Sequence, residues 1–262
     1  MTVAGLIEFR GFGVEFRPAD GRRVQALQGV DLVIHKGQFV CIVGRSGGGK
    51  STLVRALAGL VPASAGALTV DGAPVAGPGE DRVMVFQEDT VFPWLRVLDN
   101  VEFGLRNKGM SQSSRREIAR RWLGAVGLSG VEKAWPKELS GGMRKRVALA
   151  TVFATGAEIL IMDEPFGALD FVTRATLQNV LLALWSGTGT TIVFVTHDID
   201  EALALGDRIL VVSDGRLRDD LVCGLPRPRV EEVRSSPAAV EITKTIIRHL
   251  DFRLDVRAGW VG

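Results

Sequence analysis

The sequence predicts an α/β protein, because short buried strands alternate with amphipathic helices along the chain. Four apolar runs rich in β-branched residues have the length and composition of strands buried on both faces of a parallel sheet: 38–44, 159–165, 191–198 and 209–215. Helical spacing over 50–60 follows the first run and puts Leu53, Leu57 and Leu60 on one side, before Pro62 stops the helix. With 262 residues, 46% of them hydrophobic, the chain is long enough to bury such a core.

Two further parts flank or interrupt this core within a domain expected to span 1–225. Residues 14–37 predict antiparallel strands joined by turns at Asp20-Gly21 and Lys36-Gly37, and therefore an antiparallel β subdomain. Between about 92 and 156 the periodicity is mostly helical, so we expect a helical subdomain inserted there. Its helix over 114–126 carries a basic face, which indicates solvation rather than a specific anion site: Arg115, Arg116, Arg120 and Arg121.

The remaining residues, 226–262, are predicted to form a C-terminal tail with a short helix. Ser236 is of the residue type that caps a helix, and Pro237 suits the first helical position. The spacing that follows predicts an inward face made of Val240, Ile246, Ile247 and Leu250.

Charge and composition exclude several classes of protein. The net charge of +2, from 32 basic and 30 acidic side chains, argues against a protein that coats nucleic acid, so we expect no nucleic-acid partner. Cys41 and Cys223 alone make neither a disulfide scaffold nor a four-ligand zinc site, and we interpret them as reduced, buried thiols. The longest uncharged stretch, 177–197, is broken by a polar turn at 186–191, so no segment is expected to cross a membrane.

The clearest chemical motif is the run GRSGGGKS at 44–51, which fits the phosphate-binding pattern G-x-x-x-x-G-K-[ST]. Glycines let successive backbone N–H groups approach phosphate oxygens, Lys50 supplies a cation, and Ser51 offers a hydroxyl to Mg²⁺. The helix that begins here adds the positive end of its dipole. We therefore predict a P-loop NTPase core whose phosphate-binding residues are Gly44, Arg45, Ser46, Gly47, Gly48, Gly49, Lys50, Ser51 and Thr52.

A second strand narrows the choice among P-loop proteins. The run 159–164 delivers two adjacent carboxylates, Asp163 and Glu164, to the carboxyl end of a buried strand, beside the phosphate loop in a parallel sheet. Asp163 is suited to hold Mg²⁺, directly or through water. Glu164 is suited to orient or deprotonate an attacking water. The pair predicts hydrolysis of a nucleoside triphosphate.

A second anion-binding helix start is predicted at LSGGM, 139–143. Ser140 can cap the helix that follows, and Gly141 and Gly142 leave its first N–H groups uncovered. With this motif the sequence resembles the ATPase subunits of ATP-binding-cassette (ABC) transporters, whose signature reads L-S-G-G-Q or close to it. The resemblance covers about residues 6–220, and Met143 stands at the fifth signature position.

Other family motifs follow in the expected order. Gln87 lies in VFQED, residues 167–170 (GALD) resemble the D-loop that ends in Asp170, and His197 in VTHD resembles the switch histidine. By resemblance, Gln87, Glu164 and His197 are catalytic. The resemblance also implies that Gln87 contacts Mg²⁺, as Ser51 and Asp163 do, so the implied cofactors are ATP and Mg²⁺.

The family resemblance implies how the subunit assembles. Two chains dimerise head to tail, so that the motif of Ser140, Gly141, Gly142 and Met143 closes in trans over ATP on the partner's phosphate loop. The sequence also resembles, more closely, the subgroup that imports nitrate, sulfonates, taurine and related small anions. The segments that carry this resemblance are 77–105, 169–185 and the PRPR tail. The implied partners are membrane permease subunits and a periplasmic or surface substrate-binding protein. The implied location is the cytoplasmic face of the bacterial inner membrane, where the subunit is peripheral.

Three features leave alternatives open. The adenine-stacking aromatic is often tyrosine, which this chain lacks, so Phe16 is the predicted contact and Phe12 its rival. Lys145 stands where glutamine is commoner. The cluster 92–95 (FPWL) is suited to docking a coupling helix of a membrane subunit, and the alternative is a packing corner between subdomains.

Two other functions compete with the importer ATPase. A P-loop kinase or GTPase is disfavoured because no N-K-x-D guanine-reading motif is present and the signature would lack a purpose. A non-transport ABC ATPase usually carries long coiled coils or two cassettes, which 262 residues with one phosphate loop do not accommodate.

Overall fold

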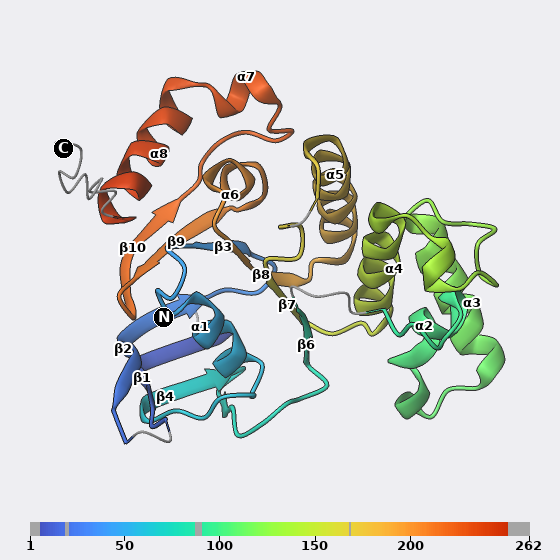
Figure 1. Cartoon of the computed structure of the whole chain (residues 1–262), viewed down its shortest axis with the longest axis horizontal. Helices are drawn as coiled ribbons and strands as arrows, with labels where there is room; N and C mark the ends of the chain where they lie inside the picture. Colours follow the sequence, from blue (N-terminus) through green and yellow to red (C-terminus); the bar gives the residue numbers. More distant parts are fainter. Residues whose placement is uncertain (1–5, 19–20, 87–90, 168, 251–262) are drawn as a thin grey trace, which may run out of the picture.

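The computed structural model describes residues 6–18, 21–86, 91–167 and 169–250, and it has the predicted α/β architecture (Figure 1). Its central sheet has the strand order β10-β9-β3-β8-β7-β6. All neighbours in it are parallel except β10, which runs antiparallel to β9. The strands are β3 (Phe39–Val43), β6 (Arg82–Val85), β7 (Ile159–Asp163), β8 (Thr191–Thr196), β9 (Arg208–Ser213) and β10 (Arg216–Val222).

The four buried strands predicted from the sequence are confirmed as β3, β7, β8 and β9. Every residue of β3, β7 and β8 is buried, as expected of strands covered on both faces. Alternate side chains enter two separate hydrophobic clusters: Phe39, Cys41 and Val43 join one, and Val40 and Ile42 join the other. The core therefore lies on both faces of the central sheet.

A second, antiparallel sheet confirms the predicted strands near the amino terminus. Its order is β2-β1-β4-β5. The sheet packs with α1 against one face of the central sheet. Its strands are β1 (Ile7–Phe16), β2 (Val24–Ile34), β4 (Ala65–Val70) and β5 (Ala73–Pro74), and α1 spans Lys50–Leu57.

The helix after the phosphate loop is shorter than predicted. α1 ends at Leu57, not near Leu60, because Gly59 adopts the left-handed conformation (φ +76°) and the Leu60 N–H turns back to the Arg55 carbonyl at 2.9 Å. The prediction that Leu60 shares the inward side of this helix is wrong, since 48% of it is exposed.

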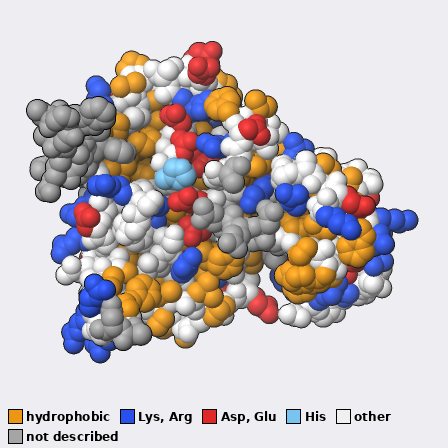
Figure 2. Space-filling model, in the orientation of Figure 1, with side chains coloured by type: hydrophobic (Ala, Val, Ile, Leu, Met, Phe, Trp, Pro, Cys, Tyr) orange, Lys and Arg blue, Asp and Glu red, His pale blue; other side chains and the backbone are white. Residues whose placement is uncertain are grey.

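Helices replace strands between β6 and β7, as predicted for this stretch. They form a lobe to one side of the central sheet (Figure 1). On the face seen in Figure 2, hydrophobic side chains gather over this lobe, with lysines and arginines around them. The elements are α2 (Val97–Phe103), α3 (Gln112–Ala125), α4 (Gly141–Ala154) and the 3₁₀ turns 106–108 and 136–138.

The basic face of α3 is partly used within the protein. Arg116 lies 3.6 Å from Asp99 and 3.7 Å from Glu102, both on α2, and Arg115 donates to the Met110 carbonyl at 2.6 Å. The predicted solvated face therefore also fastens α3 to its neighbours.

The remaining helices pack against the face of the central sheet opposite to the one covered by the antiparallel sheet and α1. They are α5 (Phe171–Thr188), α6 (Ile199–Leu205), α7 (Glu231–Arg234) and α8 (Pro237–Leu250). In α8 the predicted inward face is half wrong: Ile246 and Leu250 are buried, whereas Val240 and Ile247 are exposed. Ala239 takes the inward position instead, because α8 presents the face of Ala239, Ile246 and Leu250 to the packed core.

Within the described residues, no helix has both the length and the apolar character needed to cross a lipid bilayer.

Candidate active site

The phosphate loop leaves the carboxyl end of β3 and opens α1, as the motif requires. Gly47 and Gly49 have φ values of +76° and +105°, which L side chains rarely adopt. A Cβ on Gly49 would lie 2.8 Å from the Ala26 carbonyl oxygen, and one on Gly44 would lie 2.1 Å from that of Val212. Glycine is therefore required here both by backbone conformation and by close approach from β2 and β9.

Lys50 lies inside the loop and is 5% exposed. Its Nζ donates to the carbonyls of Gly44 at 2.9 Å and Arg45 at 3.1 Å, and lies 4.0 Å from Oε1 of Glu164. Burial lowers the pKa of the Lys50 ammonium, and the charges of Glu164 and Asp163 oppose that shift. The arrangement keeps a cation among the backbone groups that the motif assigns to phosphate.

Ser51 and Asp163 form a pair of oxygen ligands beside the loop. The Ser51 hydroxyl donates to Oδ1 of Asp163 at 3.1 Å, and Asp163, the last residue of β7, is 5% exposed. Burial raises the pKa of Asp163, and the bond from Ser51 opposes this. Such hard oxygen donors fit Mg²⁺, which binds through one or two protein ligands and substrate phosphates. Gln87, the third predicted ligand, lies outside the described residues.

Glu164 and His197 meet across the ends of two adjacent parallel strands. Asp163 of β7 is in register with Val195 of β8, and the Glu164 N–H donates to the Val195 carbonyl at 3.0 Å. His197 Nδ1 lies 2.9 Å from Oε2 of Glu164. Glu164 has a φ of +47°, a conformation that costs of order 1–3 kcal/mol in a residue with a side chain. The structure thus brings Lys50, Asp163, Glu164 and His197 together at one edge of the sheet.

The second predicted anion-binding helix start, at 139–143, is present, and it lies apart from the phosphate loop. Ser140 caps α4, its Oγ accepting from the Met143 N–H at 3.2 Å. It lines a cavity of about 460 Å³ with Gly141, Gly142 and Asp170, and the described lining includes no residue of the phosphate loop. One chain therefore carries two distinct candidate anion sites.

Asp170 caps α5, its Oδ1 accepting from the Thr173 N–H at 3.0 Å. The side-chain and backbone hydrogen bonds of Thr173 hold the pKa of Asp170 below its ordinary value. The predicted D-loop residue is thus also the residue that orients the start of α5.

Sequence reasoning missed Arg174. Its guanidinium donates to the Leu169 carbonyl at 3.1 Å and to Oδ2 of Asp198 at 2.9 Å. Asp198 follows His197 directly and caps α6, accepting from the Glu201 N–H at 3.2 Å. A single side chain therefore ties the D-loop to the segment of His197. The available signal was the position of Asp198 just before the periodic run 199–205, which is that of an N-cap.

The two candidate adenine contacts differ in exposure. Phe12 is 1% exposed and its ring packs edge-on against Phe9 at 5.2 Å, so it belongs to the core. Phe16 is 41% exposed at the end of β1 and pairs with Val24 of β2. Ala26, two residues further along β2, lies against Gly49 of the phosphate loop. Phe16 therefore remains the candidate, because its ring is open to solvent.

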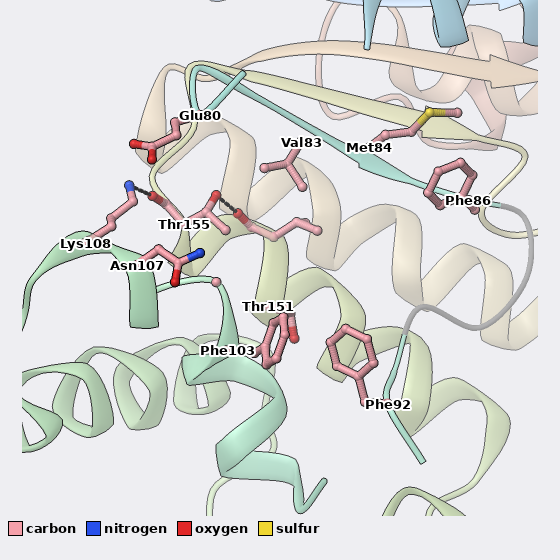
Figure 3. Close-up of a pocket in the computed structure, with 12 residues that line it drawn as sticks. Glu80, Val83, Met84, Phe86, Phe92, Phe103, Asn107, Lys108, Thr151 and Thr155 are labelled. Atoms are coloured by element: carbon pink, nitrogen blue, oxygen red, sulfur yellow. Dashed lines mark hydrogen bonds between the residues drawn. The ribbon is translucent and has the colours of Figure 1, made fainter. Parts of the chain in front are cut away.

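The cluster at 92–95 borders an apolar groove. Figure 3 shows Phe92 and Phe103 facing this cavity of about 590 Å³, with Phe86 and Met84 on β6 and the segment after it. The rings of Phe92 and Phe103 are 4.6 Å apart, and Trp94 is 69% exposed. Phe92 thus serves partly as the packing corner considered above, while the groove beside it stays open.

Asn100, which sequence reasoning also missed, fixes the shape of that cluster. It is 1% exposed; its side-chain oxygen accepts from the Phe92 N–H, and its amide donates to the carbonyls of Phe92, Leu95 and Arg96. Because one buried amide satisfies this turn, the aromatic side chains are held at the surface.

The family model described as ABC transporter matches residues 27–167. The taurine import ATP-binding protein TauB of Rhizobium johnstonii is 48% identical over 200 residues, covering 76% of each chain. The nitrate import ATP-binding protein NrtD of Synechocystis sp. is 46% identical over 205 residues, covering 78% of this chain and 77% of its own.

A solved structure shares the fold. It is the dimeric, post-hydrolysis state of an ATP-binding cassette bound to ADP and Pi, at 30% sequence identity and a TM-score of 0.72. The match covers 83% of this chain and 98% of that one.

Proposed function

This chain belongs to the ABC transporter family, and from that premise we propose that it is the ATP-hydrolysing subunit of a bacterial importer for a small anion. The observation that carries the proposal is the pair of Glu164 and His197, 2.9 Å apart, beside the buried ammonium of Lys50.

In the proposed reaction, water attacks the terminal phosphorus of ATP directly, and the bond from that phosphorus to the bridging oxygen of ADP breaks. Glu164 accepts a proton from that water, and His197 holds the carboxylate of Glu164 toward it. Lys50 and the backbone N–H groups of 44–51 bind the phosphates and stabilise their charge. Gln87 is proposed to position the same water. Adenine is proposed to stack on Phe16.

We assign Mg²⁺ to Ser51 and Asp163, with Gln87 as a further ligand. The ion, when bound, neutralises negative charge that develops on the phosphate oxygens. The oxygen donor set of Ser51 and Asp163 supports this assignment.

A second copy of the chain is the proposed partner at the nucleotide. The cavity of Ser140, Gly141, Gly142 and Met143 is separate from the phosphate loop, so a head-to-tail dimer is the arrangement that lets both contact one ATP. Asp170 borders the same cavity and would lie at the dimer interface. The dimeric state of the similar cassette supports this arrangement.

The groove beside Phe92 is proposed to receive a helix of a membrane permease subunit. An amphipathic helix laid in an apolar groove is held by aromatic anchors, and Trp94, 69% exposed, is free to act as one. The groove has a polar end, where Lys108 donates to the Thr155 carbonyl (Figure 3). Docking there would hold the subunit at the cytoplasmic face of the inner membrane.

The transported molecule is proposed to be a small anion such as nitrate, a sulfonate or taurine. The similarity to a nitrate and a taurine import ATP-binding protein supports this class. A periplasmic or surface substrate-binding protein is proposed to deliver it.

The proposal is tested by reconstitution. The chain is co-expressed with candidate permease subunits. Uptake of labelled taurine and nitrate, presented with a candidate substrate-binding protein, is then measured in right-side-out vesicles loaded with ATP. ATP-dependent uptake that disappears in Lys50→Ala supports the proposal. ATP hydrolysis without association with any permease would contradict the importer role and leave an ATPase of another kind.

A further inference from the structure

A second cavity, of about 600 Å³, lies between α5 and the C-terminal segment, apart from the nucleotide site. Its walls come from the 175–186 stretch of α5, Ala204 of α6, residues 227–230 and Arg234 of α7. α5 and α7, which both line this cavity, lie near each other along the upper edge of the view in Figure 1. The volume is in the range of small-molecule sites.

The charge of this cavity is one-sided. Among its described lining residues are three arginines, Arg227, Arg229 and Arg234, and no acidic side chain. The charge of Arg227 is balanced by an ion pair with Asp207, 2.9 Å away. Neither of the other two forms an ion pair with a carboxylate among the described residues, so the described lining carries an excess of positive charge.

Arg229 holds the wall in place. It is 9% exposed, and its guanidinium donates to the backbone carbonyls of Leu203, Gly206, Cys223 and Leu225. These bonds occupy four of its five N–H groups, and none of them goes to a carboxylate. The segment 227–230 is therefore a rigid, cationic wall rather than a loose strand.

Arg234 is the available cation. Within the described part of the chain its guanidinium makes no hydrogen bond or ion pair, and its Nε is covered without a partner. A guanidinium at the mouth of a cavity, with its donors unused, is suited to bind a carboxylate, sulfonate or phosphate in bidentate fashion.

The other wall, from α5, presents apolar side chains beside Gln178, Asn179 and Ser186. The guanidinium of Arg227 stacks on the Trp185 ring at 4.9 Å, and that ring packs edge-on against Phe39 at 5.5 Å. Leu182 and Ala183 continue the wall along α5. Such a surface matches the body of an organic molecule, while the cations match an acid group.

From these contacts we propose that this cavity binds a small organic anion, its acid group on Arg234 and its apolar body against Leu182 and Trp185. The proposed ligand rests on α5, the helix that Asp170 caps. Gln178 of this helix also lines the cavity, and its side-chain amide donates to Glu201 of α6 at 3.1 Å. The proposal does not depend on which molecule the importer carries.

The experiment is calorimetric titration of the full-length chain with benzenesulfonate, which carries both a flat apolar body and an acid group. The titration uses Lys50→Ala protein, so that the phosphate loop contributes little anion binding. We expect one-site binding, with benzyl alcohol and sulfate each binding at least about tenfold more weakly because each lacks one half of the match.

Two variants locate the site. Arg234→Gln should weaken binding about tenfold or more, and Ala183→Phe should block it by filling the cavity from α5. Arg10→Gln, an equal charge change on the exposed β1 pair with Glu8, should leave binding unchanged. Absence of saturable binding, equal binding by Arg234→Gln, or equal binding of benzyl alcohol would overturn the proposal.

Discussion

Nδ1 of His197 lies 2.9 Å from Oε2 of Glu164, and this contact joins residues that follow the ends of two neighbouring parallel strands. Glu164 reaches it from a left-handed backbone conformation, φ +47°, that a continuing strand would not adopt. The carboxylate is 20% exposed and the imidazole 60%, so water can enter from the side of His197. The strained backbone of Glu164 thus directs the carboxylate of the proposed base toward His197.

Arg174 is expected to position this pair without touching it. Arg174→Gln removes the ties to Leu169 and Asp198, so His197 loses its fixed neighbour. We expect kcat to fall roughly 10- to 100-fold with little change in KM for ATP. Arg174→Lys, which can still reach Asp198, should recover part of the rate.

The control for Arg174 is Arg208→Gln, which removes an ion pair with Asp220 at the β9–β10 edge. Steady-state kinetics and unfolding midpoints of all three variants separate positioning from stability. If Arg174→Gln lowers only the unfolding midpoint, its role is structural.

Two glycines predict opposite effects of the same substitution. Gly49→Ala places a Cβ 2.8 Å from the Ala26 carbonyl at a φ of +105°, so it should destabilise the fold by about 1–3 kcal/mol. Gly187→Ala, in the last turn of α5 with open space around it, should stabilise by up to about 1 kcal/mol. Urea unfolding without nucleotide measures both, and equal effects would refute the close approach of β2 to the loop.

Trp94 should matter for coupling rather than for hydrolysis. Trp94→Ala removes an exposed anchor beside the groove, and loss of such an anchor costs about 2 kcal/mol of docking free energy. We expect weaker association with the permease and reduced ATP-dependent uptake, at an unchanged ATPase rate of the isolated subunit. Val222→Ala, 77% exposed on β10, is the matched control. Equal losses in uptake and isolated ATPase rate would favour a packing role for Trp94.

Asp170 predicts a pH dependence of stability. Because the bonds of Thr173 lower its pKa in the folded state, its cap contributes fully above the unfolded value of about 3.9 and is lost as pH falls through the lower folded value. Asp170→Asn keeps a cap acceptor that does not titrate. The wild-type unfolding midpoint should therefore fall more steeply than that of the variant between about pH 5 and pH 2.5. Parallel curves would exclude the cap as the cause.

The phosphate loop and the strand-end carboxylates could be predicted because their signals are local. The glycines of 44–49 and the apolar run before Asp163 each specify their own backbone. The burial of the aromatic residues on β1 was harder to predict. Phe12, Val14 and Phe16 share one face by strict alternation, yet Phe16 is exposed, since the β1–β2 register shifts between Val14 and Glu15.

Contacts between distant segments could not be predicted. The pairing of Arg174 with Asp198 depends on how α5 packs beside α6, which no motif in either segment encodes. The inward face of α8 failed for the same reason: its 3.6-residue period permits several faces, and packing against the rest of the fold selects Ala239 over Val240.

Replacement of the proposed base tests the central claim most directly. Glu164→Gln keeps the size of the side chain and removes its basicity, so ATP should bind with near wild-type affinity while phosphate release slows by roughly 10²- to 10⁴-fold. Glu158→Gln, the same change at the other end of β7 in an exposed pair with Lys36, should hydrolyse ATP normally. Phosphate release from Glu164→Gln at the rate of Glu158→Gln would contradict the assignment of Glu164 as the base.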